Sequence, residues 1–507
     1  MGVESGLMEA SQRVLIQCGD HFENQCRILQ LTRTLQKLGH EPLVMLYSNG
    51  RGDIFRQTGV SVVYLNDYLQ RARPADNLKD DTAIVHGIST RDLISVEGRR
   101  RPRISWPGQM RKTRLDAQRY LFAVEQILDE HRPDRVAVWN GFTGYAANSL
   151  RMLCEKRGIG SAYLERGLAP GSLFIDKEGV NGASSLLSFD ADTCLEPTSD
   201  ELRVLEKYFP ASTTSSATSK PQTTSKTAND RNIFFPLQVE RDTNILLYSP
   251  FMTMRNAFHA AYKSFNQEQT RFVVRLHPEE EPGHRPNIPR YKNVTIDIEQ
   301  TLTEQIDAAD LVITINSTVG LEALIQGKPV CAYGQSIYSA ICTDPLQANH
   351  IDDFRVSRSI LRKYLATLCR ENLLIEGKDT NQSAVLKQLQ LQDLQIDKTL
   401  NRPIRLEQVS ALNRRFDTDE EILVDLAANP VAPLDMTYRK NKERPSLAEQ
   451  KRLLFPNINP SRIRLRPLDQ VTVRGDILVV DEGWNGSRHE YLAVANRYGV
   501  VMNSADE

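Results

Sequence analysis

Small polar residues stand where an apolar stretch ends and a helix is predicted to begin, which is where α/β folds commonly hold phosphates. Ser317 and Thr318 occupy this place, so their hydroxyls and the first N–H groups of the helix can bind a phosphate. Glu322 follows about one helical turn later, within reach of the hydroxyls of an attached ribose. The pattern indicates a nucleotide or nucleotide-sugar site. An ordinary N-capped helix beside a buried strand is an equally weighted interpretation.

A dense polar turn between two apolar stretches supplies a pair of carboxylates. Glu240 and Asp242 lie in this turn, after a strand predicted over 232–236. One of the two can attack a sugar carbon or act as a base. Alternatively, Asp242 caps the element that follows, which the apolar pattern predicts to be a strand over 244–249.

A histidine and a proline end a strongly apolar strand in the second half of the chain. His277 can donate a hydrogen bond to a phosphate or to a leaving-group oxygen, and Pro278 fixes the turn. A lone histidine is more often structural, but this one ends a strand of the same predicted domain as Ser317. Arg275 or the helix N-terminus can supply the positive potential that a departing phosphate needs, so we expect neither a metal ion nor a cofactor.

An acidic residue also ends a predicted strand in the first half of the chain. Glu165 is followed by Arg166, and Asp176 and Asn181 come shortly after. A carboxylate at this place can deprotonate an acceptor hydroxyl. Pairing of Glu165 with Arg166 at the surface is the equally weighted alternative. Asn140 ends the preceding predicted strand and is expected to line the same cleft.

Alternating strands and helices must position these residues. In the first half, strands are predicted at 13–17, 41–47, 60–65, 83–86, 135–139 and 161–164, and helices at 26–38, 111–131 and 145–157. In the second half, strands are predicted at 232–236, 244–249, 271–276, 294–298 and 311–315, and helices at 255–266 and 303–309. This alternation predicts parallel sheets covered by helices. The first turn, 18–21, is not a GxGxxG fingerprint, so no dinucleotide is assigned.

The sequence therefore predicts an α/β fold with two Rossmann-like domains facing a cleft (GT-B-like) and a helix-rich C-terminal extension. A segment rich in Ser, Thr, Lys and Pro separates the two series and is expected to be a linker or surface loop. The predicted parts are an acceptor domain at 1–210, a linker or loop at 211–230, a nucleotide-sugar (donor) domain at 231–350, a helical crossover and extension at 351–470, and a strand–helix segment at 471–507. The last part either docks on the core or starts a further module.

Composition excludes several classes of protein. With 507 residues, 40% apolar and 25% charged, the chain is typical of a soluble globular protein of two or three domains. A formal charge of −1 gives no net positive field for nucleic acid. Seven cysteines without CxxC pairs argue against zinc ribbons and disulfide frameworks. No signal peptide or membrane span is recognised, so we expect a cytoplasmic protein, with peripheral contact at the inner membrane left open.

In their order and spacing, these motifs resemble those of the bacterial capsule polysaccharide biosynthesis family of β-Kdo transferases, GT-B-like enzymes that use CMP-Kdo. The resemblance covers roughly residues 130–375. It rests on Trp139-Asn140-Gly141, Glu165-Arg166-Gly167, Asp176 with Gly179-Val180-Asn181, Gln238-Val239-Glu240-Arg241-Asp242, His277-Pro278 and Asn316-Ser317-Thr318-Val319-Gly320-Leu321-Glu322-Ala323.

The resemblance implies transfer of Kdo from CMP-β-Kdo to a glycan or glycolipid acceptor, with retention through a covalent intermediate, in capsule, O-antigen or lipopolysaccharide synthesis. It implies Asp242 as nucleophile, Glu165 as acid/base, and His277 at the CMP phosphate. The implied donor-binding residues are Gln238, Arg275, His277, Pro278, Asn316, Ser317, Thr318, Gly320 and Glu322, and the acceptor-side residues are Asn140, Arg166, Asp176 and Asn181. Arg241 departs from the family, where another acidic residue is expected.

Two alternatives remain at this stage. A nucleotide-sugar epimerase or hydrolase of the same fold shares the segment from Ser317 to Glu322, but releases free sugar without an acceptor. A non-catalytic scaffold in a polysaccharide assembly complex needs none of the carboxylates. Polar residues at three separate strand ends favour an enzyme over a scaffold.

Overall fold

The computed structural model contains two compact units. It describes residues 11–19, 22–47, 53–56, 58–72, 84–85, 87–100, 107–213, 231–251, 253–278, 286–289, 291–297, 299–348, 350–375, 382–394, 471–474 and 477–480. The first unit contains both large sheets. The described part of the second unit comprises 276–278, 286–289 and an antiparallel hairpin of β15 (Val471–Arg474) and β16 (Ile477–Val480).

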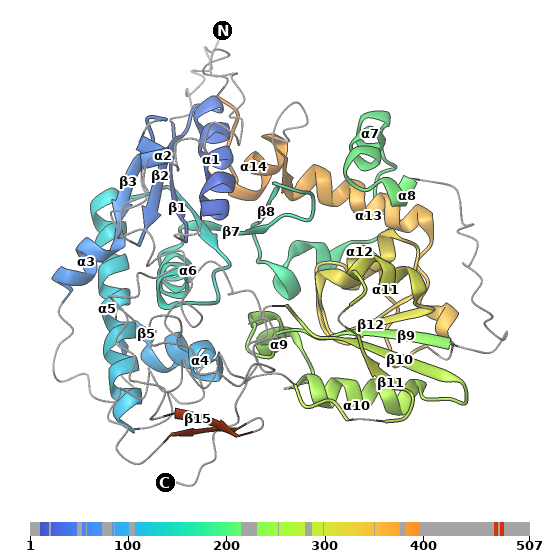
Figure 1. Ribbon diagram of the computed structural model, residues 1–507. Coiled ribbons are helices and arrows are strands. Elements are labelled where there is room, and N and C mark those ends of the chain that lie inside the picture. Colours follow the sequence, from blue (N-terminus) through green and yellow to red (C-terminus); the bar gives the residue numbers. More distant parts are fainter. Residues whose placement is uncertain are drawn as a thin grey trace. The chain divides into compact units, whose positions relative to one another are not determined.

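The first large sheet has seven strands in the order β14-β8-β7-β6-β1-β2-β3 (Figure 1). Its strands are β1 (Arg13–Gln17), β2 (Glu41–Leu46), β3 (Ser61–Tyr64), β6 (Arg135–Trp139), β7 (Gly160–Arg166), β8 (Leu173–Asp176) and β14 (Leu373–Leu374). The pairs from β3 to β7 are parallel, and β8 and β14 add antiparallel pairs at one edge. The central strands are apolar runs because helices cover both faces of such a sheet.

Helices follow the strands of this sheet in the predicted alternation. They are α1 (Phe22–Lys37), α2 (Asp53–Arg56), α3 (Leu65–Arg71), α4 (Thr90–Arg100), α5 (Pro107–His131) and α6 (Tyr145–Arg157), with a small hairpin of β4 (Ile84–Val85) and β5 (Ile88–Ser89). Helix α6 ends because Gly158 adopts the left-handed conformation, with φ of 67°. Apolar faces of α5 and α6 pack on Leu15, Val136 and Val138 to form the core of this half.

The connection to the second sheet is largely helical. It comprises η3 (Asn181–Ala183), η4 (Ser185–Ser188), α7 (Ser199–Tyr208) and α8 (Pro210–Thr213). Thr198 and Glu201 form a capping box that starts α7. Helix α8 occupies the first three residues of the expected linker at 211–230, and residues 214–230 lie outside the described part of the chain.

The second large sheet has five parallel strands in the order β11-β10-β9-β12-β13. They are β9 (Arg231–Pro236), β10 (Thr270–Arg275), β11 (Val294–Ile296), β12 (Leu311–Thr314) and β13 (Val330–Ala332), with helices α9 (Thr243–Tyr248), α10 (Met254–Phe265), α11 (Leu302–Ala308) and α12 (Thr318–Ile325). Buried Phe234, Val312 and Leu321 belong to its core. Two sheets built on parallel β/α units confirm the predicted α/β class.

After the second sheet the chain returns to the first. The elements of this return are η6 (Ser339–Ile341), η7 (Ile351–Phe354), α13 (Arg358–Glu371), β14 and α14 (Gln382–Leu389). Strand β14 pairs with β8, and α14 packs beside α1 (Figure 1). The helical crossover predicted from residue 351 is therefore interrupted, because Asn372 ends α13 and the next two residues form β14.

One element was predicted with the wrong type. Residues 244–249 form helix α9 rather than a strand. The carboxylate of Asp242 accepts a hydrogen bond from the backbone N–H of Asn244 at 2.8 Å, which caps the helix, and Ile245 and Leu246 are buried on one side of it. A short apolar run does not by itself distinguish a strand from a buried helix. Residues 395–470 of the predicted helical extension and 481–507 of the predicted strand–helix segment lie outside the described residues.

The helices that the structure describes are too short or too polar to cross a bilayer.

Candidate functional site

Strained backbone at the end of β6 places the first polar group of the site. Asn140 has a φ of 59°, a left-handed conformation uncommon outside glycine, and its N–H donates to the carbonyl of Leu164 on β7 at 2.8 Å. Gly141 follows with a φ of 84°, and a Cβ there would lie 2.5 Å from the ring of Tyr163. The backbone thus turns sharply, and the Asn140 amide donates to Oε2 of Glu165 at 3.4 Å.

Glu165 lies at the end of β7 and is partly exposed. Its Oε1 accepts a hydrogen bond from its neighbour's backbone N–H, that of Arg166, at 2.9 Å, while the Arg166 side chain is exposed. Burial raises the pKa of Glu165 above its ordinary value, and the charge of Asp242 raises it further. The hydrogen bonds from Arg166 and Asn140 and the Arg166 charge act in the opposite direction without cancelling the rise. This carboxyl group is therefore protonated more easily than a solvated glutamate.

Asp242 lies in the second half of the chain, between β9 and α9. Its side chain is exposed and caps α9 through Oδ1. Its charge acts on Glu165, so one carboxyl from each sheet lies within electrostatic range of the other. Both interpretations of Asp242 from the sequence are thus compatible with the structure, because capping uses one oxygen and leaves the other side of the carboxylate exposed.

Two amide side chains that were assigned to donor binding instead join neighbouring loops. Gln238 and Asn316 are only 6% and 5% exposed, and the Gln238 amide donates to Oδ1 of Asn316 at 2.9 Å. Oε1 of Gln238 accepts from the hydroxyl of Thr314 and from two backbone N–H groups at 3.1–3.2 Å. The Asn316 amide donates to the carbonyl of Asn244 at 2.9 Å. In the structure these groups hydrogen-bond within the chain and fix the turns after β9 and β12, and their role in donor binding stays a prediction.

The turn between β12 and α12 has the N-capped helix that the sequence offered as one interpretation, and hydroxyls remain accessible there. Ser317 caps α12 by accepting from the N–H of Val319 at 3.2 Å, and Thr318 is exposed. Glu322 is half-buried, and burial raises its pKa. Gly320 is buried for a packing reason, since a Cβ there would lie 2.2 Å from the hydroxyl of Tyr338. Gly320 is therefore not needed for a ligand contact.

Arg275 is directed to another partner. Its guanidinium donates to the carbonyl of Gln300 at 2.6 Å and to Oε1 of Gln305 at 2.9 Å. Both bonds come from Nη1, and the expectation that Arg275 supplies charge to a phosphate stays a prediction. His277 is half-buried and Pro278 exposed; both follow β10 directly and belong to the second unit, so no contact with Asp242 is assigned to them.

Asp176 is a buried structural carboxylate rather than an acceptor-side group. It is fully buried, and its oxygens accept hydrogen bonds at 2.7–3.4 Å from the backbone of Glu178, Gly179 and Ser185, the hydroxyls of Ser184 and Ser185, and the amide of Asn372. A carboxylate with this many donors is stabilised without a counter-ion. Asn181, with a φ of 55°, is half-buried at the start of η3.

An aromatic group that no sequence motif predicted lies beside Gly141. Phe142 and Tyr163 stack with ring centroids 5.7 Å apart, and the Arg151 guanidinium lies 5.0 Å from the centroid of Phe142. Tyr248 of α9 lies within range of Arg151 and Tyr163, and its pKa is raised to about 12, chiefly by burial. Isolated aromatic residues in a sequence carry no motif, so only the glycines facing them, Gly141 and Gly182, offered a signal.

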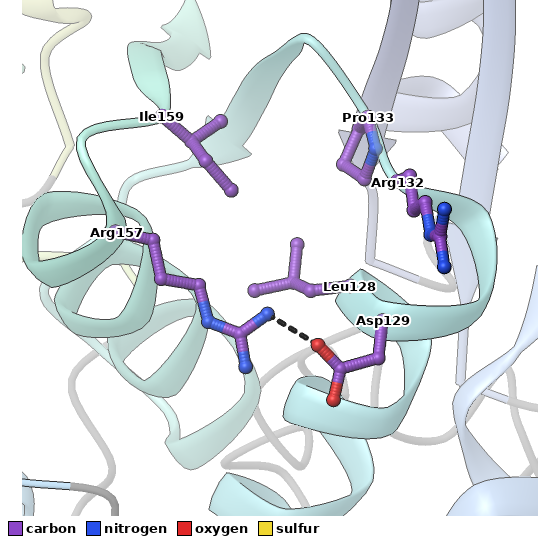
Figure 2. A pocket seen from close by; sticks show the side chains of 6 residues that line it. All are labelled: Leu128, Asp129, Arg132, Pro133, Arg157 and Ile159. Atoms are coloured by element: carbon purple, nitrogen blue, oxygen red, sulfur yellow. Dashed lines mark hydrogen bonds and ion pairs between the residues drawn. The ribbon is translucent and has the colours of Figure 1, made fainter.

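A separate pocket lies before the amino ends of β6 and β7. It has a volume of about 390 Å³ and is lined by Leu128, Asp129, Arg132, Pro133, Arg157 and Ile159 (Figure 2). Arg157 projects from α6 and donates to Asp129 at 2.7 Å and to Glu125 at 2.8 Å. Its guanidinium is thus already paired, and the pocket lies at the opposite strand ends from Glu165. Among the described residues, no group of three or more His, Cys, Asp or Glu side chains is placed to hold a metal ion.

Comparisons with known proteins place part of the chain near polysaccharide biosynthesis. Residues 202–355 match the family model described as capsule polysaccharide biosynthesis protein. Protein FixF of Sinorhizobium fredii is 31% identical over 233 residues, which are 45% of this chain and 55% of that protein. Capsule polysaccharide export protein KpsS of Escherichia coli is 29% identical over 115 residues, 20% of this chain and 29% of that protein. The matches thus span about half, and less than a third, of these relatives.

One solved structure that is similar to this chain is a β-Kdo 2,7 transferase, KpsC, of Thermosulfurimonas dismutans. It is 17% identical in sequence, and the alignment covers 59% of this chain and 95% of that one. The TM-score is 0.34, which is too low to carry an argument about function.

Proposed function

We propose that this chain belongs to the capsule polysaccharide biosynthesis proteins and acts as a glycosyltransferase. The observation that carries the proposal is a pair of carboxyl groups at strand ends of different sheets: Glu165, whose pKa is raised by burial and by the Asp242 charge, and Asp242, which is exposed and caps α9, a helix that contacts η3 of the first half. Glycosyl transfer through a covalent intermediate requires one carboxylate as nucleophile and a second carboxyl group as acid/base. The family match over residues 202–355, which includes Asp242, supports the same class of protein.

Asp242 is the nucleophile in this proposal. Its Oδ1 is held by the N–H of Asn244, so the carboxylate is oriented by α9 and attacks the anomeric carbon through Oδ2. A bond forms between Oδ2 and the sugar carbon as the bond from that carbon to the phosphate oxygen breaks. The nucleotide departs with the electron pair, and a covalent glycosyl-enzyme remains.

Glu165 is the acid/base of the second step. The acceptor hydroxyl attacks the anomeric carbon of the glycosyl-enzyme, Glu165 takes the hydroxyl proton, and the Asp242 carboxylate is released. Two displacements at one carbon give net retention. A raised pKa makes Glu165 a stronger base once it is ionised, and the Asn140 amide and Arg166 N–H hold the carboxylate in place.

The donor in this proposal is CMP-β-Kdo, in which a carboxylate is already attached to the reacting carbon. Its phosphate lies at the turn of Ser317 and Thr318, where hydroxyls and the N-terminus of α12 offer donors. Glu322 accepts from the ribose hydroxyls. The resemblance to β-Kdo transferases supports the choice of sugar. A glycan or glycolipid at the cytoplasmic face of the inner membrane is the proposed acceptor.

The test is intact-mass analysis of the full chain incubated with CMP-Kdo, which is generated in situ because it hydrolyses, with and without candidate glycan acceptors. We expect an adduct of one Kdo residue that an acceptor discharges. Asp242→Asn should abolish the adduct while keeping α9 capped, because asparagine caps helices as well as aspartate does. Undiminished turnover in this variant would overturn the assignment of Asp242.

The same assay separates the two alternatives. A hydrolase or epimerase would release or convert the sugar at an equal rate without an acceptor. A scaffold would show neither adduct nor turnover, and its biological role would survive Asp242→Asn.

A further inference from the structure

Helix α9 is fixed to the second sheet at both of its ends. Near its start, the carbonyl of Asn244 accepts from the Asn316 amide at 2.9 Å. At its end, the carbonyl of Tyr248 accepts from the N–H of Gln335, also at 2.9 Å. A Cβ at Gly334 would lie 2.7 Å from this same carbonyl, so the contact is close. Asp242, which caps α9, is thus held rigidly relative to the second sheet.

The side chain of Tyr248 leaves that sheet and packs against elements that belong to the first half of the chain. Helix α9 contacts α4 and η3. Gly182 of η3 is buried, and a Cβ on it would lie 2.5 Å from the ring of Tyr248. The ring also lies where the Arg151 charge and the Tyr163 hydroxyl act on it. Tyr248 therefore fills the place between α9 and the elements around β7, and the missing Cβ of Gly182 makes room for it.

We propose that Tyr248 is a positioning residue whose ring, seated on Gly182, sets how closely Asp242 approaches Glu165. The reason is geometric. Asp242 and Tyr248 lie at opposite ends of a six-residue helix that the second sheet holds at both ends, so a displacement at Tyr248 moves Asp242 as well. The inference rests on the proposed function for one point, the catalytic roles of Asp242 and Glu165. The contact itself does not depend on that assignment.

The separation of the two carboxyls has a measurable consequence at Glu165. Burial is the largest influence that raises the pKa of this carboxyl, and the Asp242 charge raises it further, whereas the Arg166 N–H and guanidinium and the Asn140 amide lower it. Moving Asp242 away removes only the influence of its charge. The pKa of Glu165 then falls. A general loosening of the fold would also lower it, by exposing Glu165, but it would do so equally in an Asp242→Asn background, where the effect of moving Asp242 is absent.

The experiment uses the full chain without substrate. The Glu165 carboxyl is titrated by ¹³C NMR of glutamate-labelled protein, with its signal identified by comparison with Glu165→Gln. We expect Tyr248→Phe to keep the wild-type pKa, since the ring remains. Tyr248→Ala removes the contact that holds α9 against η3, and Gly182→Ala pushes the ring away from η3, so both should move Asp242 away and lower the Glu165 pKa. Tyr208→Ala, which removes a partly buried ring on α7, is the matched control and should leave the Glu165 pKa unchanged.

Kinetics supply the second measurement. If the proposed transfer occurs, Tyr248→Ala should lower kcat by on the order of 10²-fold with little change in KM for the donor, because a misplacement of about 1 Å has that effect. An unchanged Glu165 pKa in a folded Tyr248→Ala variant would overturn the inference, whether or not Gly182→Ala folds. A Tyr248→Phe variant as impaired as Tyr248→Ala would overturn it too. Absence of transfer in the wild type would instead contradict the proposed function and leave the titration to decide.

Discussion

At the end of β7 in the first sheet, Glu165 is partly exposed and held by one backbone N–H at 2.9 Å and one amide at 3.4 Å. At the end of β9 in the second sheet, Gln238 is buried, and both ends of its amide are occupied at 2.9–3.2 Å. Both residues follow a buried strand, and the sequence predicted both to face a ligand. Only the first retains a surface on which a ligand can act.

The difference follows from what each side chain can satisfy. A primary amide donates and accepts, so it can join two turns and bury itself without penalty. A carboxylate only accepts, and burying it fully requires many donors, as Asp176 demonstrates with its backbone and side-chain partners. Glu165 has only two such donors, which do not offset the burial and the Asp242 charge that raise its pKa, and its partly exposed carboxyl is available for proton transfer.

The largest effect on this comparison is expected from Glu165→Gln. Removing the acid/base should lower the transfer rate by about 10²–10⁴-fold. In the wild type, activity that depends on the ionised base should increase as pH rises through the raised pKa of Glu165, and this limb should disappear in the variant. The measurement is the pH profile of kcat/KM for the acceptor. An unchanged profile in Glu165→Gln would contradict the role of Glu165 as the base.

The same substitution has a predictable sign in stability. Because the folded-state pKa of Glu165 is raised, its contribution to stability is present below the unfolded pKa and is lost as pH rises through the folded pKa. Glu165→Gln should therefore melt at a higher temperature than wild type above that range and show little difference below it. Thermal melts of both proteins across pH check this. A lower melting temperature of Glu165→Gln than of wild type above that range would rule out the raised pKa.

Asp176→Asn tests the contrasting carboxylate. Asparagine places an NH₂ group where the chain presents donors, so we expect a loss of about 3 kcal/mol in the free energy of unfolding. Denaturant unfolding measures it, with the exposed Asp192→Asn as the control. A folded Asp176→Asn variant with wild-type stability would mean that full occupation of its oxygens does not matter.

Gln238→Ala should have the smallest effect of the three sites. It leaves Oδ1 of Asn316 and the turn N–H groups without their partner, at a cost of about 2 kcal/mol in unfolding free energy. The exposed Gln347→Ala should change the unfolding free energy by less than about 0.5 kcal/mol. If Gln238→Ala instead kept full stability but lost donor affinity, Gln238 would be a ligand contact and the comparison would fail.

Much of the fold could be predicted, because most elements are long enough to show their period. Helix α6 has the predicted bounds, and β1, β6 and β9 agree within one residue. The failure at α9 has a local cause, since six apolar-rich residues fit a strand and a buried helix equally and the decision depends on the Asp242 cap. The hairpin at β4 and β5 was likewise only partly recognised, because two-residue strands carry no period.

The sequence by itself determined the order and type of most elements and the residues at their strand ends, since both depend on neighbours a few positions away. It could not determine which polar side chains remain available. Gln238 meets Asn316 across 78 positions, and Asp176 meets Asn372 across 196. Such partners become neighbours only when strands from distant segments align. The tertiary structure therefore decided that the Asp242 charge acts on Glu165. It also decided that Gln238, Asn316 and Asp176 are buried and hydrogen-bonded within the chain.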